Sequence, residues 1–508
     1  MSLFRVAIVG SGPSGIIAAK NFIENGVSVD LYDVGITISD SVIKDALILK
    51  SLLPKKTVFG SFFPYRRIDN LNIIQEPNVN FDTSHAKGGL SNVWGATVGS
   101  PYRKDIADWP ISFDELNAYV DKVFKIIGVT GSLDAINFLY SSKYRGAELN
   151  YETSPTLDIL NSAKKNQEYL IGSGIFVGKA RLAIQANPTE PNLCILCNKC
   201  MEGCRSNSIF SASHILNELL PSPLFHYYEG CLVEKFSEDD KGVSITFVET
   251  QIGIKKLATA DFLVLGAGCF DSTKIINAST DVREEKYLIK DSQKFYFPVF
   301  TFKSNKKNIE NSIELAHIYV QMIDYLGHII QIQLYPGSKI LIEMVQRLFG
   351  IRISRLFQKI FGLLINKFYI GMMYLHSDVS GNMELQFRDD NSAYLRGFAN
   401  KDSKRVFNSA IWKMFLNARY LRFIPIPFFF LKAKIGHSQH FGSTLPMQQN
   451  HSKIGVGVNC VVNGFLRVFV VDSSVLPSIP GTPTTTLVMA NSLRVSDEII
   501  NIIKVNTK

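Results

Sequence analysis

A glycine-rich turn between an apolar strand pattern and an apolar helix pattern is the feature that most restricts the fold of this chain. Val6–Val9 is followed by Gly10-x-Gly12-x-x-Gly15 and then by apolar residues at helical spacing. In such a unit the first glycine permits the turn, the second lets the backbone approach a phosphate, and the third lets the helix pack on the strand. The pattern predicts a Rossmann-type α/β fold.

An acidic residue at the end of the next apolar stretch favours a dinucleotide as the ligand. Asp33 lies 18 residues beyond Gly15, close to the spacing at which a carboxylate binds a ribose hydroxyl. The phosphates would lie at the N-terminus of the first helix, where free amides and the helix dipole favour anions. A glycine-rich turn that arose by chance would not explain Asp33. The motif alone does not distinguish FAD from NAD.

Length and composition place the chain among large folded proteins. With 508 residues, we expect two or more domains. The 46% of hydrophobic and 19% of charged residues exclude a disordered chain. Apolar residues never run unbroken for the ~18 positions that span a bilayer, and no signal-peptide pattern precedes the first strand. We therefore expect a cytoplasmic protein.

Three further blocks, separated along the chain, narrow the prediction. They are Lys87–Ala96, Asp108–Leu116 and Val470–Thr484, the last of which precedes a helical pattern to Ile500. Together with the N-terminal turn, these blocks resemble the glucose–methanol–choline oxidoreductase family, flavoenzymes that oxidise alcohols, and in particular its bacterial branch with a cysteine-rich loop. The resemblance does not extend to the middle of the chain, roughly 280–430.

The resemblance implies a cofactor, FAD, and the residues that bind it. The loop Gly88–Ala96 would lie against the flavin, and Asp472 would meet the ribityl–phosphate region. Some members attach FAD through a histidine just before the tryptophan, but Val93 occupies that position, so we expect non-covalent FAD. The turn Gly266–Gly268 would close on the FAD domain. The expected cofactor-binding residues are Gly10, Gly12, Ser14, Gly15, Asp33, Gly88, Gly89, Asn92, Trp94, Gly95, Asp472, Pro483 and Thr484.

A histidine near the C-terminus is the candidate catalytic base. Family members carry a histidine shortly before a glycine pair and a methionine, and His440 precedes Gly442 and Met447, with a spacing to Gly442 one residue shorter than in the commonest version. A neutral imidazole suits removal of a hydroxyl proton while hydride leaves the carbinol carbon for the flavin. His437 is the alternative base.

The residue before the Pro483-Thr484 pair departs from the family pattern. Members often have a second histidine or an asparagine there, whereas this chain has Thr482. A threonine hydroxyl donates and accepts hydrogen bonds but is no base at neutral pH. Either His440 works alone while Thr482 orients the substrate, or the chemistry departs from simple alcohol oxidation.

Four of the seven cysteines form one compact cluster. Cys194, Cys197, Cys200 and Cys204 have the spacing C-x2-C-x2-C-x3-C of bacterial ferredoxin loops, with Arg205 in place of the usual proline. Some relatives hold an iron–sulfur cluster at this place, so we favour one here, while zinc, a disulfide and unligated thiols stay open. A cluster would pass electrons from reduced flavin to an acceptor protein or a quinone. The other three cysteines are expected in the core.

Two basic, apolar stretches suggest contact with a membrane surface. Lys339–Tyr369 and Trp412–Lys434 each carry a net charge of +5, which exceeds half of the chain's total of +9. Such stretches are attracted to anionic lipid; the alternative is a substrate-domain wall with a solvated basic face. The substrate would be a sugar or polyol alcohol, either a small molecule or linked to a lipid. No motif supports nucleic-acid binding.

The predicted architecture is a discontinuous FAD-binding domain with an inserted substrate domain. The FAD-binding part would comprise 1–279 and 435–508, and the substrate domain, with an antiparallel sheet and helices, 280–434. Strands are expected near 313–333 and 383–395, and His376 is expected on a strand. Two alternatives to the enzyme remain, a redox or electron-transfer flavoprotein without alcohol turnover and a paralogue that binds FAD only structurally.

Overall fold

The computed structural model describes most of the chain, namely residues 4–37, 63–140, 142, 144, 146–201, 203–280, 286–304, 312–337, 365–449 and 455–506. None of the helices in these ranges has the length and apolar character that a membrane span requires.

The N-terminal strand lies at the centre of a five-stranded parallel sheet. Its strands are β1 (Arg5–Val9), β2 (Ser28–Asp33), β5 (Phe225–Glu229), β9 (Phe262–Leu265) and β20 (Val468–Val470). Their order is β20-β9-β1-β2-β5, and all four pairs are parallel. The inner strands β1 and β9, and β20 beside them, are short apolar runs because they are buried on both faces, whereas the edge strand β5 is largely exposed. The predicted Rossmann-type sheet is confirmed.

Five helices from different parts of the chain pack against this sheet or on one another. They are α1 (Pro13–Glu24), α3 (Phe113–Ile127), α6 (Ala212–Leu219), α7 (Cys269–Ser279) and α12 (Thr485–Asn506). Proline at the first position of α1 is favourable, because an amide at that position would have no hydrogen-bond partner within the helix. Helices α1 and α12 pack together, and the Ser492 hydroxyl of α12 donates to the Ser14 carbonyl at 2.6 Å. The C-terminus therefore completes the N-terminal fold.

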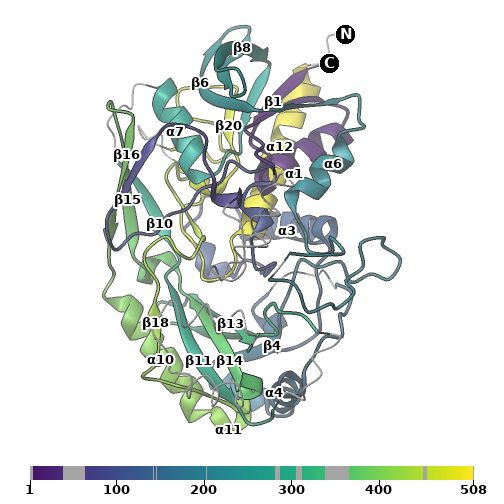
Figure 1. Ribbon diagram of the computed structural model, residues 1–508, viewed down its shortest axis with the longest axis vertical. Coiled ribbons are helices and arrows are strands. Elements are labelled where there is room, and N and C mark those ends of the chain that lie inside the picture. The colour runs from purple at the N-terminus through teal and green to yellow at the C-terminus, as the bar shows by residue number, and fades with distance from the viewer. Residues whose placement is uncertain are drawn as a thin grey trace.

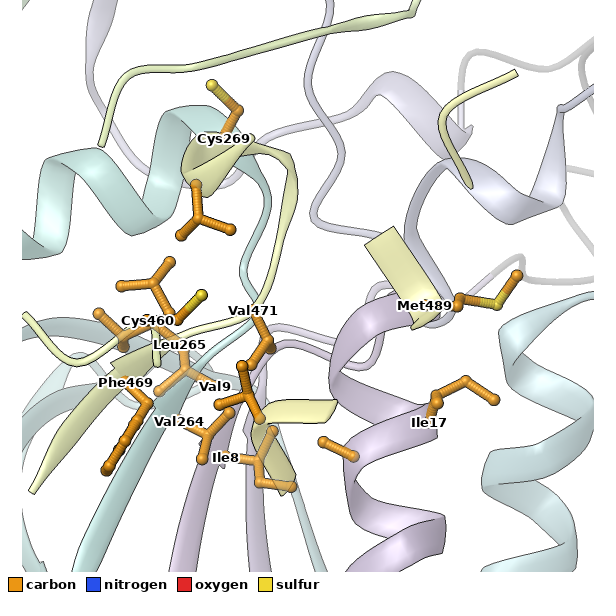
Figure 2. Close-up of a cluster of buried hydrophobic side chains, with 14 of the residues drawn as sticks. Ile8, Val9, Ile17, Val264, Leu265, Cys269, Cys460, Phe469, Val471 and Met489 are labelled. Atoms are coloured by element: carbon orange, nitrogen blue, oxygen red, sulfur yellow. The ribbon is translucent and has the colours of Figure 1, made fainter. Parts of the chain in front are cut away.

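A buried apolar cluster holds sheet and helices together. Figure 2 shows Ile8 and Val9 of β1 beside Val264 and Leu265 of β9, with Ile17 of α1 close by. All five side chains are at most 5% exposed. The three cysteines outside the predicted loop are buried too, as expected.

The other three sheets of the described residues are antiparallel except for one parallel pair, β3 (Asn72–Gln75) with β16 (Ser392–Phe398). A small one contains β6 (Cys231–Asp239), β7 (Gly242–Glu249) and β8 (Ile254–Ala260). The largest contains β4 (Ile175–Lys179), β11 (Lys294–Thr301), β12 (Ile318–Ile323), β13 (Ile329–Pro336), β14 (Phe368–Tyr374), β17 (Phe423–Pro425) and β18 (Leu431–Lys432). Its helices are α4 (Ser154–Lys165), α5 (Gln167–Gly172), α10 (Asp402–Leu416) and α11 (Ala418–Leu421).

A further five-stranded sheet lies between the two ends of the molecule. It contains β3 (Asn72–Gln75), β10 (Lys286–Asp291), β15 (Asn382–Arg388), β16 (Ser392–Phe398) and β19 (Phe441–Gly442). Short 3-10 helices connect the elements: η2 (Phe63–Tyr65), η3 (Gly89–Asn92), η4 (Arg103–Ile106), η5 (Ala135–Phe138), η6 (Ile365–Lys367), η7 (Ser377–Val379) and η8 (Ser473–Val475). Figure 1 shows β1 and α1 at one end of the molecule and β11, β14, α10 and α11 at the other.

Strands lie close to both places where the sequence predicts them, near 313–333 and 383–395. The prediction for His376 was wrong, because this residue follows β14 and caps η7, where its ring accepts a hydrogen bond from the Asp378 amide at 3.2 Å. Strands β3, β4 and β19 lie outside 280–434 in sequence but pair with strands inside that range. The domain boundaries stay a prediction.

Candidate active site

The turn between β1 and α1 needs glycine for reasons of space. Gly10 has a φ of +96°, and a Cβ there would lie 2.6 Å from the Gly266 carbonyl oxygen. A Cβ on Gly15 would lie 2.0 Å from the Gly10 carbonyl oxygen. Gly12 is different, because a Cβ there would lie 3.9 Å from its nearest neighbour, the Gly266 carbonyl oxygen. Gly12 caps α1 without a side-chain hydrogen bond, which leaves the first amides of the helix free for an anion.

Asp33 ends β2 beside this turn. Its carboxylate accepts hydrogen bonds from the Ser11 hydroxyl and, at 3.2 Å, from the Tyr227 hydroxyl. Burial raises the pKa of Asp33 to about 6 against these hydrogen bonds. The Ser11 hydroxyl in turn accepts from the Gly88 amide at 2.9 Å. One short network thus joins the predicted ribose-binding acid to the second glycine-rich loop.

A cavity of about 220 Å³ lies over the turn. The predicted cofactor-binding residues that line it are Gly10, Gly12, Ser14, Asp33, Gly89, Asp472 and Thr484. Its wall also includes Gln439 and Phe441, the two neighbours of His440 in sequence. The cavity therefore extends from the acid at the end of β2 to the segment that carries the predicted catalytic base.

The side chain of Asp472 is engaged by the protein itself. It accepts from the Gly268 amide at 3.0 Å, from the Ser272 hydroxyl, and from the Ser474 amide at 3.0 Å. Burial raises its pKa. Asp472 therefore ties the C-terminal segment to the turn Gly266–Gly268, as well as lining the cavity.

The loop that follows Gly88 is held by its own side chains. The Asn92 amide donates to the carbonyls of Lys87 at 2.9 Å and Gly89 at 2.7 Å. The Trp94 indole donates to the Phe210 carbonyl at 2.8 Å. Gly95 lies against the large sheet, since a Cβ there would be 3.1 Å from the Tyr335 hydroxyl. These contacts fix the loop at the junction between the cavity and the large sheet.

His440 is partly buried and stacks on Tyr374 of β14, with ring centroids 4.8 Å apart. Its Nδ1 is buried without a hydrogen-bond partner among the described residues. Burial, and then the Lys294 ammonium, lowers the pKa of His440 to about 3. The imidazole is therefore neutral throughout the pH range near 7.

A polar, aromatic group that the sequence did not reveal surrounds His440. The Lys294 ammonium lies 4.7 Å from the centre of the Tyr296 ring and 5.2 Å from that of Tyr374. The Tyr296 hydroxyl is 3.2 Å from His437 Nε2, and the Asn80 amide lies 2.8 Å from His437 Nδ1. Both ring nitrogens of His437 are thus engaged, and burial lowers its pKa to about 4.

Thr482 and Pro483 lie beside Gly99. A Cβ on Gly99 would be 3.3 Å from the Thr482 Cβ and 3.5 Å from the Pro483 ring. The preceding Gly481 lies against β14, since its Cβ would be 3.0 Å from the Tyr374 carbonyl oxygen. The segments of His440 and of Thr482 therefore both reach Tyr374, although they are separate in sequence.

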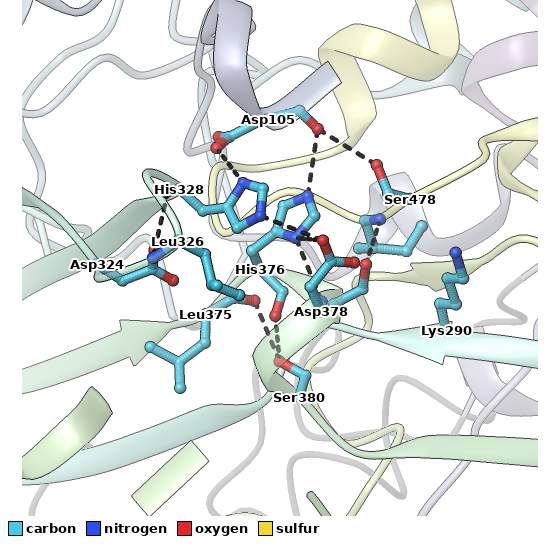
Figure 3. Close-up of polar contacts among 12 residues, drawn as sticks. Asp105, Lys290, Asp324, Leu326, His328, Leu375, His376, Asp378, Ser380 and Ser478 are labelled. Atoms are coloured by element: carbon cyan, nitrogen blue, oxygen red, sulfur yellow. Dashed lines mark hydrogen bonds and ion pairs between the residues drawn. The ribbon is translucent and has the colours of Figure 1, made fainter. Parts of the chain in front are cut away.

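A second unpredicted cluster lies behind this segment (Figure 3). His328 stands between two carboxylates, with Nδ1 3.4 Å from Asp105 and Nε2 3.2 Å from Asp378. Burial opposes the charge on His328, but the two acids raise its pKa to about 9. The ring of His376 stacks on it at 3.8 Å, and the Asp105 carbonyl accepts from Ser478 at 3.3 Å. The cluster holds the Ser478 segment in place.

The four cysteines of the predicted metal loop are free and partly buried. Leu196 and Asn198, between them, have φ values of +51°, which turns the backbone around the thiols. The Leu196 amide hydrogen-bonds to Cys194, although burial raises the pKa of that thiol. Burial also opposes the Cys204 thiolate, but hydrogen bonds from Ser208, Ile209 and Ser206 outweigh it and lower the pKa.

No cysteine belongs to a close ligand group in the part of the chain that the structure describes. The two such groups, with ligand atoms within 4.8 Å of one another, are His328–His376–Asp378 and Asp69–His85–Asp271. A cavity of about 280 Å³ separates Cys200 and Cys204 from Asn92 and Trp94. The cysteine loop is thus adjacent to the predicted flavin loop.

Comparisons with known proteins support the fold. No protein-family model matches the sequence, and no curated protein matches it in sequence. The structure of pyridoxine 4-oxidase from Mesorbium loti is 13% identical, with a TM-score of 0.63, over 97% of this chain and 99% of that one. An FAD-dependent oxidoreductase from Chaetomium thermophilum is 13% identical, with a TM-score of 0.60, over 99% of this chain and 100% of that one.

A formate oxidase is also 13% identical, with a TM-score of 0.64, over 99% of each chain. The similarity extends along the whole length in all three cases. At this level of identity the comparisons establish the fold, including the middle of the chain where the sequence carries no recognisable block.

Proposed function

We propose that this chain is an FAD-dependent oxidoreductase of the glucose–methanol–choline type that oxidises a CH–OH group. One observation carries the proposal: the cavity over the Gly10–Gly15 turn also borders Gln439 and Phe441, on either side of the neutral His440. The candidate proton acceptor thus lies, in sequence, between two residues that border the predicted dinucleotide site. The three structural neighbours, two oxidases and an FAD-dependent oxidoreductase, agree with this proposal.

The residues present fit FAD. Gly12 leaves room for a phosphate above the free amides of α1, and Asp33 offers a buried carboxylate to ribose hydroxyls. Val93 has no group that could bond to the flavin covalently, so the cofactor would be held non-covalently. When bound, FAD accepts the hydride that leaves the substrate carbon.

In the proposed reaction, His440 Nε2 removes the substrate's hydroxyl proton. The other ring nitrogen, Nδ1, is buried and cannot meet a substrate. The lowered pKa keeps the imidazole neutral, so its unprotonated nitrogen has a lone pair that can accept the proton. Thr482 would orient the hydroxyl through its own hydrogen bonds. His437 is the weaker candidate because Asn80 and Tyr296 already engage both of its nitrogens.

Replacing Lys294 by Met moves the pH dependence of flavin reduction to higher pH. Burial and the Lys294 ammonium both lower the pKa of His440, so loss of the ammonium raises this pKa towards its ordinary value of ~6.5. A protonated imidazole cannot accept, and the acid limb of the rate–pH profile therefore shifts upwards. Rates of anaerobic flavin reduction, measured from about pH 4 to about pH 9, would give this shift. Lys434→Met, whose ammonium acts on His437, is the control; an equal shift there would contradict the assignment.

We also propose that the cysteine loop holds an iron–sulfur cluster through which electrons leave for an acceptor protein or a quinone. The proposal is supported by the ferredoxin-like spacing, the hydrogen bonds to the Cys194 and Cys204 sulfurs, and the position of the loop beside Trp94. Such an exit favours a dehydrogenase over an oxidase. The same feature favours the alternative function, an electron-transfer flavoprotein without alcohol turnover.

Cys200→Ser and Cys204→Ser are each expected to lower bound iron and acid-labile sulfide several-fold while FAD is retained. Each variant removes one thiolate ligand from the cluster. Metal analysis after anaerobic purification measures the effect, and Cys231→Ala, a buried cysteine outside the loop, is the control. Wild-type protein that contains zinc instead of iron would support the zinc alternative and contradict the cluster.

A further inference from the structure

Large apolar side chains are exposed together along one side of α10 and on the segment after β17. Trp412, Phe415 and Leu416 are 44%, 40% and 77% exposed, and Phe428 and Phe429 are 84% and 46% exposed. The Trp412 ring lies 5.4 Å from that of Phe415 and 6.1 Å from that of Phe428. We call these five residues the aromatic face.

The aromatic face is not part of the core. Helix α10 already buries a separate apolar side, where Phe407 stacks on Phe295 of β11 at 4.5 Å and Met414 is fully buried. A helix that lies on a sheet and faces water is normally polar on its outer side. Clustered exposed apolar side chains of this size mark a surface that binds a partner.

The segment that contains the aromatic face is basic. The segment 412–434 contains five basic residues and no acidic one. Arg422 pairs with Asp158 at 3.0 Å. Among the described residues, Lys413 donates to the Gly174 carbonyl at 3.3 Å and forms no ion pair, and neither do Lys432 and Lys434. A segment that combines lysines without acidic partners and exposed aromatic rings has the composition that attracts a protein to anionic lipid headgroups.

The other basic, apolar stretch, Lys339–Tyr369, lies mostly outside the described residues, which stop at 337 and resume at 365. The Phe368 carbonyl accepts a hydrogen bond from the Gly337 amide at 2.8 Å. Phe368 pairs with Phe300 of β11, which pairs on its other side with Ile424 of β17. The pairing register therefore places Phe368, a described residue near the end of this stretch, two strands from β17 in the large sheet.

We propose that the aromatic face seats this protein peripherally on a membrane surface that contains anionic lipid. Aromatic side chains would enter the interfacial region while the lysines approach the headgroups. Figure 1 shows α10 and α11 at the end of the molecule opposite β1 and α1, so the parallel sheet would face away from the bilayer. This inference does not depend on the proposed oxidation.

Vesicle co-sedimentation of the full-length, cofactor-loaded protein tests the proposal. We expect binding to vesicles of phosphatidylcholine with phosphatidylglycerol, and at least tenfold weaker binding to phosphatidylcholine alone. Trp412→Ser combined with Phe428→Ser should weaken binding tenfold or more. Lys432→Gln combined with Lys434→Gln should remove most of the preference for anionic vesicles and its salt dependence. Thermal unfolding would show that the variants remain folded.

A matched control uses exposed apolar residues elsewhere. Ile254 and Leu257 of β8 are 53% and 67% exposed, near β1 at the other end of the molecule. Their double replacement by Ser should leave vesicle binding unchanged. Failure of the wild-type protein to bind anionic vesicles would overturn the proposal and leave an acidic protein as the partner of this surface. Equal binding by the aromatic double variant would overturn it as well.

Discussion

Replacement of His440 by Asn lowers the rate of substrate-driven flavin reduction by about two to four orders of magnitude, the usual contribution of a general base. Its ring is neutral, stacked on Tyr374, and lies between the two residues that border the dinucleotide cavity. Asparagine keeps a similar size and polarity but cannot accept the proton. Anaerobic stopped-flow reduction, with the member of an alcohol panel that bleaches the wild-type flavin, is the measurement.

Two readouts separate loss of the base from loss of the fold. The FAD content of His440→Asn and its reduction by dithionite should match those of the wild type. His437→Gln should reduce the rate far less, because hydrogen bonds from Asn80 and to Tyr296 already occupy its ring. Bleaching by alcohol at the wild-type rate in His440→Asn would exclude this residue as the base. If no alcohol bleaches the flavin of the wild type, but the protein exchanges electrons with an acceptor, the alternative function, an electron-transfer flavoprotein, would be favoured.

Gly15→Ala abolishes FAD binding and lowers the thermal stability of the apoprotein. The new methyl group would lie 2.0 Å from the Gly10 carbonyl oxygen, so α1 must move away from β1. Overpacking of this kind typically costs about 1–3 kcal/mol, and the shifted helix no longer presents its first amides to the phosphates. FAD content after purification and the melting temperature of the apoprotein measure the two effects.

Gly12→Ala separates cofactor binding from folding. The nearest atom to its added Cβ is 3.9 Å away, so the apoprotein should melt as the wild type does, while FAD binds at least tenfold more weakly because the methyl group occupies the phosphate's approach. Gly172→Ala, at the end of α5 with open space around it, should change neither quantity. Normal FAD content in Gly12→Ala would argue against a phosphate at this turn.

Local patterns in the sequence predicted the parts of the fold that depend on local geometry. The strand–turn–helix unit, the acid that ends β2 and the long C-terminal helix all lie where the residue patterns place them. These features need only neighbours in sequence, since backbone space and the first turn of a helix decide them. The buried state of Cys231, Cys269 and Cys460 followed from their apolar surroundings.

The groups around His440 could not be predicted in this way. Lys294 and Tyr296 come from β11, Tyr374 from β14, and they meet only because these strands pair in one register. Likewise, His328 meets His376 and Asp105 through contacts between segments far apart in sequence, and no motif marks any of them. His376 was expected on a strand because it follows apolar residues, but the strand ends at Tyr374 and the histidine caps η7.

The sequence by itself determined the Rossmann-type unit, the glycines of its turn, the excess of basic charge in two apolar stretches and the close spacing of four cysteines. Only the tertiary structure decided which of these features share a space. It placed the neighbours of His440 on the cavity that contains Asp33, the cysteine loop beside Trp94, and the aromatic face on the outer side of α10. The physical reason is that spacing along a chain sets local conformation, whereas strand register and helix packing set which distant side chains meet.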